Sequence, residues 1–174
     1  MLECRGAMDV TLVPVGTIKR PLLQAVKTHL ESMGVSCSIG EEQPVPDRGY
    51  NPGRDQYLVH PFLELVKIPR GHHLLITNVD LYTKDLNFIF GYAPGPNAII
   101  STARLQGARL EERTIKEAVH ELGHVLSLGH CPNPLCVMHF SNILSDTDYK
   151  SAAFCSECLK KLPLSLQKRF DLTE

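Results

Sequence analysis

Hydrophobic and polar residues alternate with two different periods near the start of the chain. Residues Asp9–Val15 are mostly apolar and β-branched, which indicates a buried strand. From Pro21 to Met33 the apolar residues recur as on one face of a helix, with proline at the start and Gly34 just past the end. Val35–Ile39 alternates like a second strand. This region therefore predicts a strand, a helix and a strand.

The middle of the chain is predicted to contain one loop, one helix and three strands. Proline and glycine are frequent in Glu41–Gly53, which indicates a loop. A helix is expected at Arg54–Lys67, with Pro61 early in it. The apolar runs that follow predict strands at His73–Leu81, Asn87–Tyr92 and Ala98–Thr102. This order of elements argues for a mixed sheet covered by helices.

A further amphipathic segment begins near Leu110 and carries the residues with the clearest chemistry. Two acidic residues at its start suit the positive end of a helix. On a helical wheel His124 falls about 40° from His120, whereas the apolar residues occupy the opposite side. Glu121 falls about 100° from His120, beside the histidine face. We therefore expect one buried face and one face that presents two imidazoles and a carboxylate.

The spacing His120-Glu121-x-x-His124 suits a zinc site. It provides two nitrogen ligands and a carboxylate that can take a proton from metal-bound water. Gly129 permits the chain to leave the helix in a left-handed conformation, so that His130 could reach the same metal. Three protein ligands with one open position are typical of catalytic zinc. The pattern indicates amide hydrolysis, with Glu121 as the base.

Four cysteines downstream form a second candidate metal site. Cys131 directly follows the third histidine, Cys136 comes after four intervening residues, and Cys155 and Cys158 form a CxxC pair. Two thiol pairs separated by a loop indicate a structural zinc site without an open coordination position. Such a site would fix the C-terminal segment to the loop that follows the histidine. Two disulfides, or unlinked buried cysteines, are the alternatives.

The composition is that of one globular domain. The chain has 174 residues, of which 43% are hydrophobic and 21% charged, so it can form a core of its own. A formal net charge of −1 gives no reason to expect nucleic acid or an anionic membrane as a partner. No apolar run reaches the roughly 20 residues of a membrane span, and the N-terminus lacks a signal-peptide pattern. We therefore expect a cytoplasmic monomer whose clustered cysteines bind metal.

The run from His120 to Cys131, followed by Cys136, Met138 and the CxxC pair, resembles the archaemetzincins. These are metzincin peptidases that join an extended HExxHxxGxxH zinc motif to a four-cysteine zinc site. The resemblance implies an α+β fold of α/β character. It has a twisted, mixed five-stranded sheet, a backing helix, an active-site helix and a small zinc-clipped C-terminal subdomain. Residues 1–174 would form a single metallopeptidase domain, divided into subdomains at 8–130 and 131–174.

The same resemblance implies two Zn²⁺ per chain and a peptide or protein substrate. Glu121 would act as general base and then as acid, and Met138 would lie at the Met-turn beneath the catalytic metal. The strand at Ala98–Thr102 is similar to the metzincin edge strand that pairs with extended substrate. The zinc ligands would be His120, His124 and His130 for the catalytic ion, and Cys131, Cys136, Cys155 and Cys158 for the structural ion.

One position departs from the family motif. The glycine expected at its eighth position is Ser127 here, and a glycine follows two residues later as Gly129. A left-handed turn at Ser127 would cost about 1–2 kcal/mol. If Gly129 takes the turn instead, the approach of His130 to the metal changes.

Two other functions fit part of the pattern. The chain could be a non-catalytic zinc-binding module with a vestigial histidine site, although a structural site has no use for Glu121. It could also be a different hydrolase that uses the same three histidines with Co²⁺ or Fe²⁺.

Overall fold

The computed structural model describes residues 8–66 and 71–170. The last residue of the predicted helix at Arg54–Lys67 lies outside the described residues.

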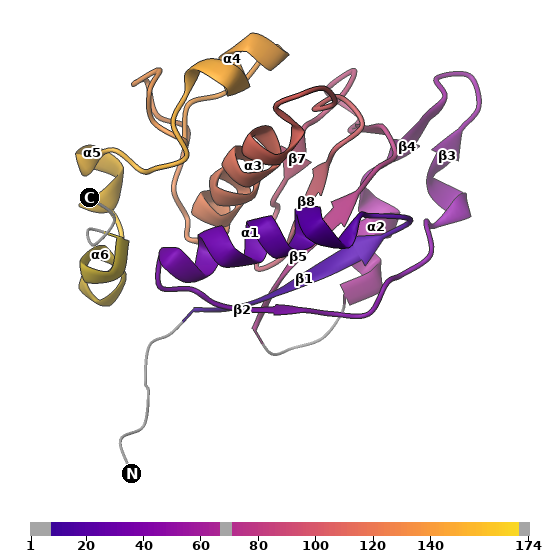
Figure 1. The fold of residues 1–174 in the computed structure, drawn as a ribbon. Coiled ribbons are helices and arrows are strands. Elements are labelled where there is room, and N and C mark those ends of the chain that lie inside the picture. The colour runs from indigo at the N-terminus through magenta and orange to yellow at the C-terminus, as the bar shows by residue number, and fades with distance from the viewer. Residues whose placement is uncertain (1–7, 67–70, 171–174) are drawn as a thin grey trace.

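A mixed five-stranded sheet forms the centre of the fold (Figure 1). Its strand order is β2-β1-β5-β8-β7, and β7 is the only antiparallel strand among them. Each pair of parallel strands is joined by a crossover, as parallel pairing requires. The strands are β1 (Asp9–Val15), β2 (Ser36–Ile39), β5 (His72–Thr77), β7 (Gly91–Tyr92) and β8 (Ala98–Ser101).

Helices cover both faces of this sheet, and successive residues along a strand pack alternately against the helices on one face and the other. The helices α1 (Arg20–Ser32) and α3 (Leu110–Val125) pack on one face, with Val10 and Leu12 of β1 beneath them. The short helix α2 (His60–Leu63) packs on the other face. Because α1 backs the sheet beside the histidine-bearing α3, the predicted fold class is confirmed.

The predicted helix at Arg54–Lys67 is wrong in its first half. Gln56–Leu58 is a strand, β4, and only α2 and the 3₁₀ turn η2 (Glu64–Val66) are helical. The amide of Tyr57 donates to the carbonyl of Asp80, so β4 pairs with β6 (Leu81–Tyr82). Long-range pairing has overridden the local helical pattern. Part of the predicted loop also has regular structure, as the 3₁₀ turn η1 (Asp47–Gly49) and the strand β3 (Tyr50–Asn51).

The predicted edge strand is also wrong. Ala98–Ser101 lies inside the sheet between β5 and β7, and all four of its residues are buried. The edge is β7, which the turn containing Pro94 and Pro96 returns antiparallel to β8. The strand predicted at Asn87–Tyr92 is shorter than expected, since only its last two residues join this sheet.

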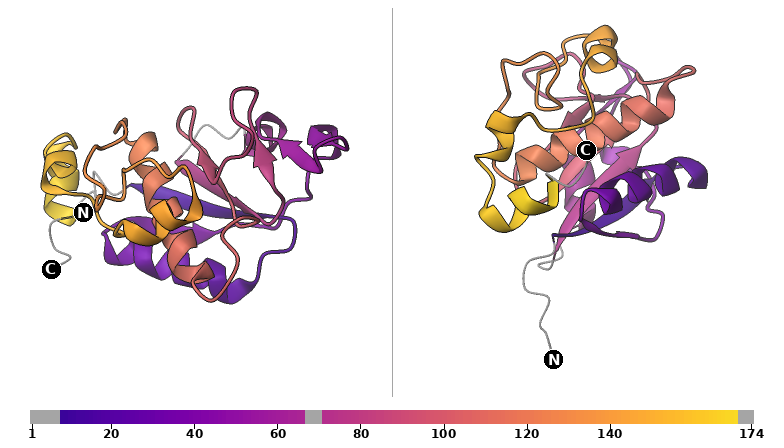
Figure 2. Two further views of the ribbon diagram at one scale, coloured as in Figure 1. Left: turned by 90° about the horizontal axis from the view of Figure 1, so that it is seen from above. Right: turned by 60° about the vertical axis from the view of Figure 1, so that its left-hand side comes forward.

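The C-terminal segment shares the core of the main sheet. Its helices are α4 (Leu144–Tyr149), α5 (Ser156–Leu159) and α6 (Leu164–Phe170). The helices α5 and α6 lie at one end of the molecule, opposite the β3–β4 hairpin (Figure 2). Buried Leu162 and Phe170 belong to the same hydrophobic cluster as α1 and α3. The division into subdomains at residue 130 stays a prediction.

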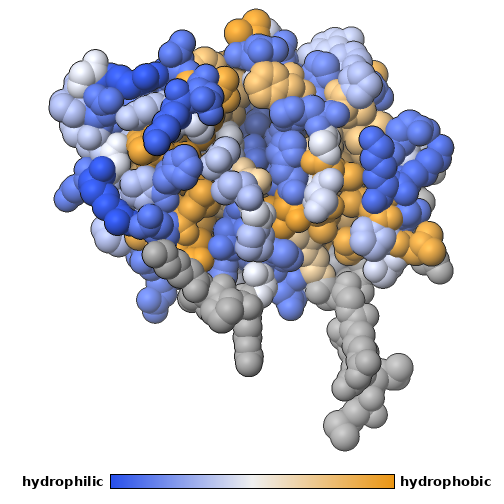
Figure 3. Space-filling view, turned by 180° about the vertical axis from the view of Figure 1, so that it is seen from behind, coloured by the Kyte–Doolittle hydropathy of each residue, from blue (hydrophilic) through white to orange (hydrophobic). Residues whose placement is uncertain are grey.

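Figure 3 shows the molecule from behind the view of Figure 1. On this face hydrophilic and hydrophobic residues are interspersed. None of the helices within residues 8–66 and 71–170 combines the length and the apolar character that a membrane span requires.

Candidate active site

The helix α3 ends in a turn that brings the third histidine back toward the first two. The amide of Ser127 donates to the carbonyl of His124 and the amide of Leu128 to that of Gly123, both at 2.9 Å. These two hydrogen bonds form a Schellman motif, which requires a left-handed residue. Ser127 is that residue, with φ of +68°, and Gly129 is not among the described residues of positive φ. Of the two positions considered for the left-handed turn, Ser127 is therefore the one that takes it.

The three histidines converge on one point. Their ligand nitrogens all lie within 4.8 Å of one another. Nδ1 of His120 lies 2.7 Å from the carbonyl oxygen of Val137, and Nδ1 of His124 lies 2.9 Å from that of Leu128. Because a carbonyl only accepts hydrogen bonds, each Nδ1 carries the proton and each Nε2 keeps its lone pair.

This geometry fits a metal ion. The Nε2 atoms of His120 and His124 face each other at 3.1 Å. Two lone pairs at this distance repel unless a cation lies between them. Tetrahedral zinc with bonds of 2.0–2.1 Å separates its nitrogen ligands by about 3.3 Å. Burial lowers the pKa of His120 well below its usual value, and burial also lowers the pKa of His130, so both rings favour the neutral form that binds metal.

Glu121 lies buried beside these histidines, with one carboxylate oxygen unsatisfied. Its Oε2 has no hydrogen-bond partner in the structure. Burial raises the pKa of Glu121 well above its usual value, and the nearby carboxylate of Glu117 adds to this, whereas Lys150 opposes it. A Cβ atom on Gly91 of β7 would lie 2.3 Å from Oε1 of Glu121, so only glycine leaves room for this carboxylate.

A cleft of about 550 Å³ opens over the cluster. It is lined by the three histidines and Glu121 on one side and by Gly91 and Tyr92 of β7 on the other. His130 is exposed, whereas His120 is buried. The histidine cluster therefore has one face open to a substrate.

Met138 lies in a tight turn against α3. The amide of His139 donates to the carbonyl of Cys136 at 2.9 Å and closes the turn. A Cβ atom on Gly123 would lie 2.2 Å from Sδ of Met138, so this glycine lets the sulfur pack directly on the helix backbone. The preceding residue, Val137, supplies the carbonyl that orients His120.

The four cysteines form a second cluster. All four Sγ atoms lie within 4.8 Å of one another. Cys131 and Cys155 have Sγ atoms 3.7 Å apart, and those of Cys136 and Cys158 are 3.8 Å apart. A disulfide needs about 2.0 Å, so the disulfide alternative is wrong for these cysteines. Tetrahedral zinc with Zn–S bonds of 2.3 Å separates its sulfurs by about 3.8 Å, so the cluster could hold this metal.

One thiol of this cluster ionises readily. Burial raises the pKa of Cys155, but hydrogen bonds from the amide of Cys158 and from the neighbouring thiols outweigh it, and the net pKa is about 7. Burial raises the pKa of Cys136 and, to a larger extent, that of Cys158.

The helical-wheel prediction gave α3 one buried face, but the structure buries residues on its other side as well. Lys116 and Glu117 are buried although they lie off its apolar face. Glu117 accepts from Thr147 at 3.0 Å and pairs with Lys150 at 3.1 Å, so α4 and the loop after it cover this side. No periodic signal marks these contacts, since both partners come from the C-terminal segment.

The three convergent histidines could hold a metal ion, and the family match shows that the chain is a zinc metallopeptidase. The profile of peptidase family M54 matches residues 62–164, which is more than half of the chain. The archaemetzincin of Pyrococcus furiosus is 41% identical over 175 residues, which cover 88% of this chain and 91% of that protein. The chain therefore belongs to peptidase family M54, and the resemblance to the archaemetzincins is confirmed.

Solved structures agree. The crystal structure of an archaemetzincin from Methanopyrus kandleri has a TM-score of 0.83 and 33% identity, covering 98% of this chain and 99% of that one. An archaemetzincin from Archaeoglobus fulgidus, solved in complex with malonate, has a TM-score of 0.82 and 35% identity, covering 89% and 100%. A peptidase implies a peptide or protein substrate.

Proposed function

We propose that His120, His124 and His130 bind a catalytic zinc and that Glu121 is the general base of peptide hydrolysis. The observation that carries this proposal is the buried Oε2 of Glu121, which lacks a partner beside three converging imidazoles. A buried unsatisfied carboxylate oxygen is costly, and such groups are frequent where a proton is to be moved.

Zinc bound at the three histidines would lower the pKa of a coordinated water to about 7 and polarise the scissile carbonyl. Glu121 would accept a proton from the attacking water as its oxygen bonds to the carbonyl carbon. Glu121 would hold this proton until the carbon–nitrogen bond breaks. Glu121 would then pass the proton to the leaving amine.

The proposal extends to the cysteine cluster and to Met138. The four thiols would hold a second, structural zinc, giving two per chain, because four sulfurs leave no open position. Met138, packed under the histidine helix, would be the Met-turn of a metzincin-type peptidase. The free edge of β7 beside Glu121 suits an extended substrate, which would add to the sheet as a further strand. A cytoplasmic location and a monomeric state stay predictions.

The test compares Glu121→Gln with the exposed control Glu157→Gln. Both should keep two zinc ions per chain by metal analysis. Glu121→Gln should lower kcat/KM on a peptide library by about 10²–10⁴-fold, the usual share of a general base, and Glu157→Gln should not. Chelation should abolish cleavage and added zinc should restore it. Wild-type activity in Glu121→Gln would disprove the assigned base, and an inactive parent with full zinc would favour the non-catalytic module.

A further inference from the structure

Lys150, the residue after α4, is almost completely buried, with 1% of its surface exposed. Lysine is rarely buried to this extent, because its ammonium group must give up its water. In Lys150 two protein groups replace that water. Its Nζ pairs with Oε1 of Glu117 at 3.1 Å and donates to the carbonyl of His139 at 3.4 Å. The two partners come from different segments, α3 and the turn at Met138.

The carboxylate that pairs with this lysine is buried as well. Glu117 is 3% exposed, and it also accepts a hydrogen bond from Thr147 of α4 at 3.0 Å. The network thus joins α3 to α4 and to the chain after Met138. A buried ion pair adds little net stability, because the loss of hydration offsets the attraction between the charges. Its value can lie instead in fixing one arrangement of the segments that it joins.

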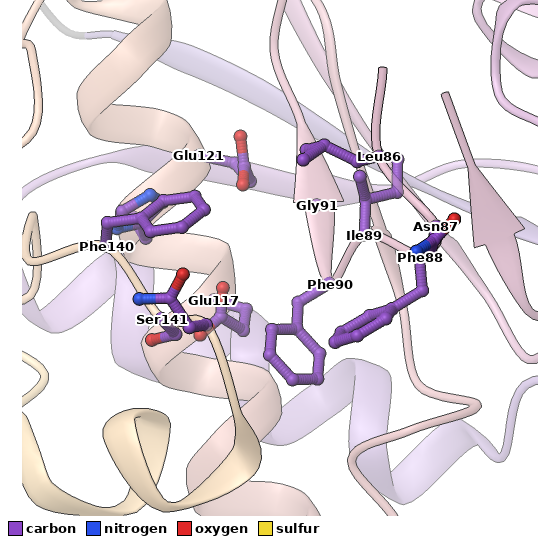
Figure 4. Close-up of a pocket in the computed structure, with 12 residues that line it drawn as sticks. Leu86, Asn87, Phe88, Ile89, Phe90, Gly91, Glu117, Glu121, Phe140 and Ser141 are labelled. Carbon is purple, nitrogen blue, oxygen red and sulfur yellow. The ribbon is translucent and has the colours of Figure 1, made fainter. Parts of the chain in front are cut away.

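On α3 the network lies next to the candidate base. Glu117 comes one helical turn before Glu121, and Figure 4 shows both projecting from the helix toward a cavity of about 270 Å³. Glu121 also lines the cleft over the histidines, so the two hollows adjoin. Lys150 lines neither of them. Its influence on the site must therefore act through the residues that it holds.

On the other segment the network lies next to the group that orients a histidine. His139 belongs to the turn that contains Met138. Two residues before His139, the carbonyl of Val137 lies 2.7 Å from Nδ1 of His120. Lys150 thus anchors to α3 the same turn that meets α3 at His120. A hydrogen bond to the second ring nitrogen orients a histidine ligand, and its loss typically weakens metal binding by about 10- to 100-fold.

We propose that Lys150 is a positioning residue of the histidine site. Through its contacts with Glu117 and His139 it holds the turn against α3, so that the carbonyl of Val137 keeps Nε2 of His120 aimed at the metal. This inference rests on the proposed function of the three histidines as a zinc site.

The test compares Lys150→Met with the double variant Glu117→Gln/Lys150→Met. The single variant leaves the carboxylate of Glu117 buried without its counter-ion, so its thermal midpoint should fall clearly. The double variant leaves no lone charge and should recover most of that loss. The matched control is Lys160→Met, which removes an exposed lysine paired with Glu157 at 2.7 Å and should behave like the parent in every assay.

Zinc affinity is the readout that a merely structural lysine would not move. Competition with a chelator should show about 10- to 100-fold weaker zinc binding at the histidines in both Lys150 variants. The release step that is absent in His124→Ala identifies this site, and the zinc of the cysteine cluster should be retained. At saturating zinc, kcat on peptides should fall by about 10- to 100-fold. KM should stay close to that of the parent, because Lys150 does not line the cleft.

The double variant decides the proposal. Parental zinc affinity would overturn it even if kcat fell, because the effect would then not pass through His120. A double variant that cannot fold would also overturn it, since the pair would then serve the fold as a whole.

The proposed peptidase chemistry can fail or survive separately. Parental affinity in the double variant, with zinc-dependent cleavage that Glu121→Gln abolishes, would leave the peptidase intact and remove this role of Lys150. Weakened zinc binding in the double variant, with a parent that cleaves no peptide, would support the role of Lys150 and count against the proposed chemistry.

Discussion

The histidine cluster and the cysteine cluster differ in how the protein encloses them. The histidines stand at the wall of a cleft, where His130 is exposed and Glu121 has a free oxygen. The thiols lie in the core, with three of four residues buried, and the amide of Cys155 donates to Sγ of Cys136 at 3.3 Å. The two clusters converge in a similar way, but only the histidine cluster lies open to a cleft.

The two clusters are nevertheless joined through the backbone at two points. His130 and Cys131 are neighbours in sequence, and the amide of Cys131 donates to the carbonyl of Met138 at 2.9 Å. Cys136 precedes Val137, whose carbonyl orients His120. The cysteine cluster therefore fixes the turn on which the histidine cluster depends.

The largest effect on stability is expected from Cys158→Ser. It removes one of four thiols from the core and should reduce the zinc count from two to one. Loss of a structural metal belongs to the few changes that cost about 4 kcal/mol or more in free energy of unfolding. Urea denaturation and metal analysis would measure both.

The matched control is Cys37→Ser, which changes a buried free cysteine on β2 outside the cluster. It should keep two zinc ions and cost about 1–2 kcal/mol. Equal losses in free energy of unfolding for the two variants would mean that the thiol cluster holds no metal. The proposed difference between the histidine and cysteine clusters would then be wrong.

Gly123→Ala should give the next largest effect. The new methyl would meet Sδ of Met138 at 2.2 Å and a ring carbon of Phe154 at 3.0 Å, so the turn must move. Overpacking of this kind costs about 1–3 kcal/mol. Gly129→Ala is the control, because a Cβ there meets nothing within 4 Å, and it should change stability by less than about 0.5 kcal/mol. If both variants were equally stable by thermal unfolding, Met138 would not be packed as described.

His124→Ala should separate activity from stability. We expect one zinc to be lost and peptide cleavage to disappear, while the free energy of unfolding at low free zinc falls by only about 1 kcal/mol. The apolar face of α3 packs on the sheet without help from His124. Circular dichroism and metal analysis test this prediction. If His124→Ala lost as much stability as Cys158→Ser, the histidine and cysteine clusters would not differ in their contribution to the fold.

The smallest effect is a gain, from Ser127→Gly. Glycine adopts the left-handed turn without the 1–2 kcal/mol that a Cβ costs there, but it also raises the entropy of the unfolded chain, so the net gain is about 0.5–1 kcal/mol. Ser127→Ala keeps the strained backbone and should leave the thermal midpoint nearly unchanged. A loss of stability in the glycine variant would mean that the serine hydroxyl contributes more than the left-handed conformation costs.

The local hydrophobic pattern was sufficient to predict the elements that pack against the central sheet or form part of it near the start of the chain. The strand at Asp9–Val15 is β1 as predicted, and α1 begins one residue before the predicted Pro21 and ends one before Met33. The prediction for Arg54–Lys67 failed because Tyr57 and Leu58 pair with β6, a contact that no local pattern encodes. Ala98–Ser101 was mistaken for an edge because a fully buried strand and an edge strand can have the same apolar sequence.

The candidate site was predictable where its residues follow a fixed spacing. One helical turn separates His120 from His124, so their shared face follows from the sequence alone. The space that Gly91 leaves for Glu121 and the pairing of Glu117 with Lys150 were missed, because each joins segments distant in sequence. The glycine at 123 stood inside the motif, but its packing role appears only once Met138 is placed.

The contact between the carbonyl of Val137 and His120 has one more consequence, which concerns the order in which parts of the chain are synthesised. It can hold His120 in place only when the turn around it is fixed, and the thiol of Cys136 finds its partner 22 residues further on, at Cys158. A growing or truncated chain that stops before Cys155 therefore contains every histidine, but it lacks two of the four cysteines whose cluster fixes the turn that positions His120. We expect such a fragment to lack peptidase activity.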